Sequence, residues 1–148
     1  MGLAKKRNDT QYYCKNSLFF NLLRPVLNES VYVMVKVRIA GLLKPSAGMT
    51  RSNWQKAFDS ISSKYVDFAI CEQSSLQPLC AIELNDKSYQ HKSKQGRNKF
   101  IAEAFGSAHM PLHFMAARRT YNVERLRTLL GLYVIPGKVS PLPVIEKA

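Results

Sequence analysis

Acidic residues are scarce in this chain of 148 residues, which has 10 Asp and Glu against 22 Lys and Arg and a formal net charge of +12. Long apolar runs are absent too, since none approaches the roughly 18 residues that cross a bilayer. No basic amphipathic helix with an aromatic face, the kind that lies on membrane surfaces, stands out either. The positive charge therefore indicates a polyanionic partner, and we expect DNA or RNA and no membrane.

Cysteine and histidine are also rare, with three of each. Cys14, Cys71 and Cys80 form no C-x-x-C pair, and an odd number leaves at least one thiol outside any disulfide. A proline interrupts the H-x3-H spacing of His109 and His113, which argues against a zinc site on one helical face. The amino terminus shows no apolar h-region of a signal peptide. We therefore expect buried free thiols and a cytoplasmic location.

One domain is the simplest organisation for a chain of this length. We interpret residues 1–15 as a basic arm, residues 16–132 as the domain and residues 133–148 as a proline-rich tail. Apolar periodicity predicts the order helix, strand, helix, strand, strand, helix, strand, helix (αβαββαβα). This order is typical of an α/β (α+β) domain, a mixed sheet of about four strands with helices on both faces. The expected helices cover residues 16–27, 52–61, 100–108 and 122–131, and the expected strands cover 31–39, 66–71, 78–84 and 111–117.

The same periodicity predicts the hydrophobic core. The alternating apolar residues from Val31 to Ile39 are expected to line one buried face of a strand. Leu126, Leu129 and Leu130 are expected in the core on the last helix, and Trp54 is expected to anchor the second helix.

Two acidic residues interrupt the central pair of strands, although carboxylates are depleted in strands and rarely buried without a partner. Asp67 lies in the strand over 66–71 and Glu83 in the strand over 78–84. If the strands form a hairpin, cross-strand side chains lie about 5 Å apart, and two carboxylates at that distance favour a cation between them. A magnesium ion there would suit phosphodiester hydrolysis. The alternative is structural, with each acid paired to a nearby Lys or Arg.

These segments resemble the PD-(D/E)XK, or restriction-endonuclease-like, superfamily, in the branch of very short patch repair endonucleases. Residues 54–68, WQKAFDSISSKYVDF, and 82–89, IELNDKSY, are similar to the patterns W-x-x-A-F-x-x-I-S-x-K-H-x-D-F and I-E-L-D-D-x-S-H. Those patterns are typical of an uncharacterised bacterial family, domain of unknown function 2726. The resemblance covers roughly residues 16–130 and implies a restriction-endonuclease-like core of αβββαβ type with further helices.

The resemblance implies a metal-dependent nuclease site on the two strands. Asp67, Glu83 and Asp86 would hold Mg²⁺ or Mn²⁺. The catalytic set would be Asp67 and Glu83 with Asn85, which stands where relatives have a second acid, and Lys87. Lys87 follows Glu83 in an E-x3-K spacing that replaces the usual E-x-K, and would orient water or stabilise charge.

Several positions depart from the family pattern, and they leave two main interpretations open. The acid of the first helix falls at Asn16 or Ser17, an acid after the basic stretch is Asn98, and the usual His is Tyr89. In one interpretation the protein is a Mg²⁺-dependent DNA endonuclease or nickase. In the other, the fold is catalytically degenerate and binds nucleic acid or a protein partner as an adaptor subunit. A purely protein-interaction subunit is a third class.

A basic stretch after Asp86 is the main candidate for contact with nucleic acid. Cations near the start of a helix oppose its dipole, and a bound phosphate would remove that penalty. Two arginines after the last strand form a second candidate. A homodimer or a larger nucleoprotein assembly is compatible with so small a chain. The expected nucleic-acid-binding residues are Lys92, Lys94, Arg97, Lys99, Arg118 and Arg119.

Overall fold

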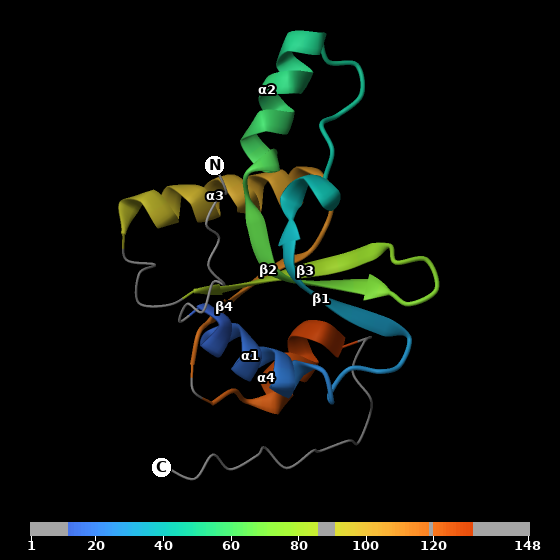
Figure 1. Cartoon of the computed structure of the whole chain (residues 1–148), viewed down its shortest axis with the longest axis vertical. Coiled ribbons are helices and arrows are strands. Elements are labelled where there is room, and N and C mark those ends of the chain that lie inside the picture. Colours follow the sequence, from blue (N-terminus) through green and yellow to red (C-terminus); the bar gives the residue numbers. More distant parts are fainter. Residues whose placement is uncertain (1–11, 86–90, 119, 132–148) are drawn as a thin grey trace, which may run out of the picture.

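The computed structural model describes residues 12–85, 91–118 and 120–131 (Figure 1). The predicted order of helices and strands is confirmed, with one added 3-10 turn, η1. The expected arm and tail fall largely on residues 1–11 and 132–148, which lie outside the described residues. The helices are α1 (Tyr12–Leu23), α2 (Arg51–Ser62), α3 (Lys92–Ser107) and α4 (Val123–Leu130), η1 spans Ile39–Gly41, and the strands are β1 (Val31–Arg38), β2 (Tyr65–Glu72), β3 (Pro78–Asn85) and β4 (Leu112–Ala116).

The four strands form one mixed sheet in the order β1-β2-β3-β4, which confirms the predicted α/β class. The β1–β2 and β2–β3 pairs are antiparallel, and β4 runs parallel to β3. Because parallel strands need a crossover, α3 connects β3 to β4 across one face. The carboxyl ends of β3 and β4 therefore meet at one edge of the sheet, where Asn85 pairs with Ala116.

Helices cover both faces of the sheet (Figure 1). α1 and α4 lie together on one face, where Phe19 and Leu126 pack against Phe68 of β2 and Ile82 of β3. α3 lies across the other face, where a second core cluster includes Ile101 and Phe105 of α3 together with Val66, Ala81 and Ile39. No helix within the described ranges is long and apolar enough to cross a membrane.

Three expectations about the helices and the core need correction. α3 begins at Lys92 instead of residue 100, so the basic stretch is helical. β1 is an edge strand, and the side chain of Val35 is 48% exposed although Val31 and Ile39 are buried. Trp54 is 40% exposed because α2 projects away from the sheet, and its ring stacks on Phe58 with centroids 5.3 Å apart (Figure 1).

Other core predictions are confirmed. Leu126 and Leu130 of α4 are buried, and Leu129 packs against the same cluster from a half-buried position. Cys71 and Cys80 are buried free thiols, as expected from the odd number of cysteines. The first helix ends at Leu23, two residues before Pro25, which cannot continue a helix without loss of a hydrogen bond.

Candidate functional site

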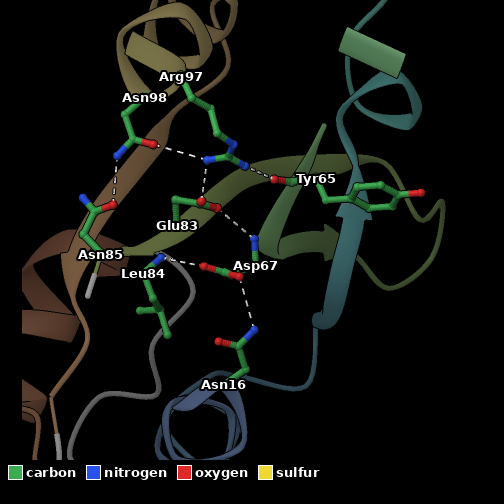
Figure 2. A network of polar contacts seen from close by, with 8 residues as sticks. All are labelled: Asn16, Tyr65, Asp67, Glu83, Leu84, Asn85, Arg97 and Asn98. Carbon is green, nitrogen blue, oxygen red and sulfur yellow. Dashed lines mark hydrogen bonds and ion pairs between the residues drawn. The ribbon is translucent and has the colours of Figure 1, made fainter. Parts of the chain in front are cut away.

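Two buried carboxylates lie on neighbouring strands, one near the start of β2 and the other near the end of β3. Asp67 and Glu83 are each 7% exposed. The backbone N–H of Asp67 donates to Glu83 Oε2 at 3.1 Å, and the backbone N–H of Leu84 donates to Asp67 Oδ2 at 2.8 Å (Figure 2). Each carboxylate thus accepts a hydrogen bond from the backbone of the opposite strand, and the pair ties β2 to β3.

Helices on opposite faces of the sheet supply donors to the remaining carboxylate oxygens. Asn16 of α1 donates from Nδ2 to Asp67 Oδ1 at 3.2 Å. Arg97 of α3 forms an ion pair with Glu83, in which Nη1 lies 2.8 Å from Oε1. The Nη2 group of Arg97 donates to the carbonyl oxygen of Tyr65 at 2.6 Å (Figure 2). All four oxygens of the two carboxylates therefore accept hydrogen bonds within the protein.

Amide side chains extend this network. Asn98 donates from Nδ2 to Asn85 Oδ1 at 2.9 Å, and its own Oδ1 accepts from Arg97 Nη1 at 3.2 Å. Asn16 and Asn98 are each 6% exposed. The structure thus gathers three positions at which the resemblance places acids and this chain has amides. We call the following six residues the amide–carboxylate centre: Asn16, Asp67, Glu83, Asn85, Arg97 and Asn98 (Figure 2).

The charge of Arg97 compensates part of the electrostatic cost of this arrangement. Burial raises the pKa of Glu83 above its ordinary value, and the negative charge of Asp67 raises it further. The charge and hydrogen bond of Arg97, together with the backbone N–H of Asp67, act in the opposite direction. Two carboxylates and one guanidinium leave a formal charge of −1 at the centre. A buried acid pair needs a cation nearby, and here a side chain of the protein provides it.

The same residues fall within a known family. The profile of DUF2726, a protein family of unknown function, matches residues 12–132. The chain belongs to the DUF2726 family. No curated protein and no solved structure matches it significantly. The DUF2726 match runs from the start of α1 to just beyond the end of α4, so it includes every residue of the amide–carboxylate centre.

The donors of this DUF2726 centre do not fit a magnesium ion as they are arranged. Mg²⁺ requires near-octahedral oxygen coordination, and a second cation beside Glu83 would meet the guanidinium of Arg97. Within the residues that the structure describes, no group of three or more His, Cys, Asp or Glu is placed to hold a metal. Asp86 and Lys87, expected as a ligand and as a catalytic residue, lie outside the described residues.

The predicted nucleic-acid-binding residues on α3 divide into two kinds. Lys92 and Lys99 are exposed, and Lys94 is half-buried. Arg97 instead points into the amide–carboxylate centre and binds Glu83 and the start of β2 (Figure 2). Its assignment to the binding surface remains untested, but its observed partners are the carboxylate and a backbone carbonyl.

The second basic candidate lies at the sheet edge where β3 and β4 end. Arg118 is exposed just after β4, and its backbone N–H donates to the hydroxyl of Tyr121 at 2.9 Å. Arg119 lies outside the described residues. Sequence reasoning missed Arg125 of α4, which lines the same open cavity as Arg118. The alternation of Arg125 and Arg127 with the buried Leu126 was the available signal, because it places charged residues on the outer side of α4.

Proposed function

We propose that this DUF2726 protein binds nucleic acid on a PD-(D/E)XK-like scaffold whose metal position is taken by Arg97, and that it does not cut its ligand. The observation that carries the proposal is the ion pair of Arg97 with Glu83 inside a network that saturates both carboxylates. A guanidinium at that point supplies the compensating charge that a divalent cation would otherwise supply.

The charge distribution supports DNA or RNA as the partner. The chain carries a formal net charge of +12, and the amide–carboxylate centre contributes only −1 to it. Lys92 and Lys99 of α3 are exposed, as are Arg118 and Arg125 near the carboxyl ends of the parallel strands. Lys and Arg side chains that contact phosphates supply most of the sequence-independent affinity for nucleic acid. A cytoplasmic location fits the free thiols of Cys71 and Cys80.

The amides support binding without hydrolysis. Asn16, Asn85 and Asn98 have the shape of the acids that the resemblance places there, but they lack the charge that attracts a divalent cation. They also satisfy their neighbours, since Asn16 donates to Asp67 and Asn98 donates to Asn85. The centre is thereby stabilised in a form that needs no metal ion.

A Mg²⁺- or Mn²⁺-dependent endonuclease or nickase is the second candidate. One observation favours it: Asp67 and Glu83 are retained side by side in a buried position, where burial raises the pKa of Glu83. Buried acids with shifted pKa values concentrate at functional sites. This candidate requires Arg97 to release Glu83 before a metal ion can bind.

The decisive experiment measures binding and cleavage on the same samples. Fluorescein-labelled DNA and RNA, single- and double-stranded, are titrated with the protein in EDTA, in Mg²⁺ and in Mn²⁺. Anisotropy reports binding and a denaturing gel reports chain length. We expect binding in EDTA and full-length nucleic acid in all three buffers.

Two outcomes would contradict the proposal. Absence of binding to every ligand would remove nucleic acid as the partner and leave a protein-interaction subunit. Metal-dependent shortening that is lost in both Asp67→Asn and Glu83→Gln would establish the endonuclease instead. Glu124→Gln is the matched control, because Glu124 is an exposed acid on α4 outside the centre.

A further inference from the structure

An open cavity of about 260 Å³ lies beside the amino end of α4. Its lining includes Arg118, Thr120 and Arg125 together with the end of β4. β4 ends next to β3, and the backbone N–H of Ala117 donates to the carbonyl oxygen of Asn85 at 2.6 Å. The cavity therefore opens at the same edge of the sheet as the amide–carboxylate centre.

Two arginines give this cavity a positive charge that the described neighbours leave uncompensated. Arg118 and Arg125 are both exposed, and neither guanidinium makes an ion pair with any residue in the described parts of the chain. The acid next in sequence, Glu124, pairs with Arg127 at 2.8 Å instead. Guanidinium groups bind phosphate oxygens through paired, charge-assisted hydrogen bonds.

The backbone that carries these arginines is held in place by short-range hydrogen bonds. Tyr121 is buried, and its hydroxyl accepts from the backbone N–H of Arg118. The side chain of Asn122 caps α4 by accepting from the backbone N–H of Glu124 at 2.8 Å. The turn between β4 and α4 is thus fixed at both ends, so the wall of the cavity is formed before any ligand arrives. Such preorganisation lowers the entropic cost of binding.

We propose that this cavity binds one phosphate group of a nucleic-acid strand, held between Arg118 and Arg125. The inference rests on the proposed function, because it names the part of the ligand that this edge of the sheet receives. The cavity is smaller than the roughly 300 Å³ at which pockets for drug-sized molecules begin, so it suits a phosphate and its sugar better than a larger group. The phosphate is either internal to the strand or its terminal 5′-phosphate.

The test compares paired substitutions that remove equal charge. Arg118→Gln with Arg125→Gln removes both guanidiniums from the cavity. Lys44→Gln with Arg51→Gln removes two exposed cations near the start of α2, on the other side of the sheet from α4 (Figure 1). Each protein is titrated in EDTA with short labelled strands that carry a 5′-phosphate or a 5′-hydroxyl, over a range of salt concentrations. Inorganic phosphate serves as a competitor.

We expect the cavity pair of substitutions to weaken binding at least about tenfold, the value of one hydrogen bond to a charged group, and to lower the salt slope by about 0.7 per phosphate lost. The control pair should cause a smaller loss. A preference for the 5′-phosphate strand that the cavity variant abolishes identifies a terminal phosphate, whereas equal loss on both strands identifies an internal one.

Equal effects of the two pairs of substitutions, with nucleic acid still bound by the native protein, would overturn the cavity proposal alone. Failure of the native protein to bind any strand would overturn the proposed function as well. If the double variant melts early by circular dichroism, Arg125→Gln alone replaces it, because the Arg125 side chain is exposed and makes no ion pair in the described chain.

Discussion

Glu83 and Arg97 form the pair on which the amide–carboxylate centre depends. A carboxylate that is 7% exposed loses most of its hydration, and the neighbouring charge of Asp67 adds repulsion. Arg97 offsets both effects through an ion pair and through its bond to the Tyr65 carbonyl, which links α3 to the start of β2. The arginine therefore acts on stability and on the chemistry of the site together.

Arg97→Gln is expected to lower the free energy of unfolding by about 1–3 kcal/mol, because it leaves a buried carboxylate without its cation. Urea denaturation at neutral pH measures this change. In the double variant Arg97→Gln with Glu83→Gln, no carboxylate remains unpaired at position 83, so the combined loss should be smaller than the sum of the single losses. Additive losses would show that the two side chains do not interact in solution.

At the residue scale the sequence reveals the acids more readily than their partner. Asp67 and Glu83 stand out because carboxylates are rare within strands. The inward direction of Arg97 depends on the packing of α3 against β2 and β3, 14 residues from Glu83 and 32 from Tyr65, and no local pattern contains that information. The amides at 16 and 98 were visible only through the resemblance to a family pattern.

At the element scale, α3 and α2 show where periodicity succeeds and fails. The first half of α3 has no apolar residue before Phe100, so nothing in the sequence signals a helix there, although the helix begins at Lys92. α2 has a clear apolar face with Trp54 and Phe58, yet it projects from the sheet, and Trp54 remains 40% exposed. Periodicity indicates which face is apolar, whereas tertiary packing decides whether that face is buried.

Replacement of aromatic residues on α2 and α3 tests this difference. Trp54→Ala should cost only about 0.5–1.5 kcal/mol, mainly the stacked contact with Phe58. Phe105→Ala should cost about 3–5 kcal/mol, because Phe105 is 1% exposed and its removal leaves a cavity in the core. Thermal or urea denaturation measures both losses. Similar costs for the two variants would show that α2 packs more deeply than described.

The β2–β3 hairpin protects its two thiols from reagents. Burial raises the pKa of Cys80 to about 11, and burial also raises the pKa of Cys71. Since the thiolate is the nucleophile, neither thiol should react with Ellman's reagent at pH 8 until the hairpin opens. A Cys14→Ser background isolates these two residues. Rapid reaction of either thiol in the native state would contradict the burial of the hairpin.

The same thiols give a pH dependence of stability with a definite sign. Cys80 keeps its proton in the folded state up to about pH 11, whereas the unfolded chain releases it near the ordinary value of 9.0. The unfolded state therefore binds fewer protons in this window, and the contribution of Cys80 to stability falls as the pH rises from about 9 to 11. Cys80→Ala should show a shallower decline over that range. An identical decline in both proteins would contradict the shift.

At the scale of the whole molecule, the order of the elements and the mixed α/β class were predictable from sequence. Strands such as β2 and β3 have dense β-branched runs, and the apolar spacing of α1 and α4 matches a helix. The parallel pairing of β3 with β4 and the shared edge of Asn85 and Arg118 were not, because pairing between distant segments leaves no local signature. That shared edge places the cavity beside the amide–carboxylate centre.

The net charge of +12 is the property of the whole molecule that bears most directly on the central claim of metal-independent binding to nucleic acid. The deciding measurement is the dissociation constant for duplex and single-stranded DNA in EDTA as a function of salt. Phosphate contacts by Lys92, Lys99, Arg118 and Arg125 predict a log–log slope of magnitude about 3, at roughly 0.7–0.9 per contact. Absence of binding at low salt, or binding that does not change with salt, would contradict the account.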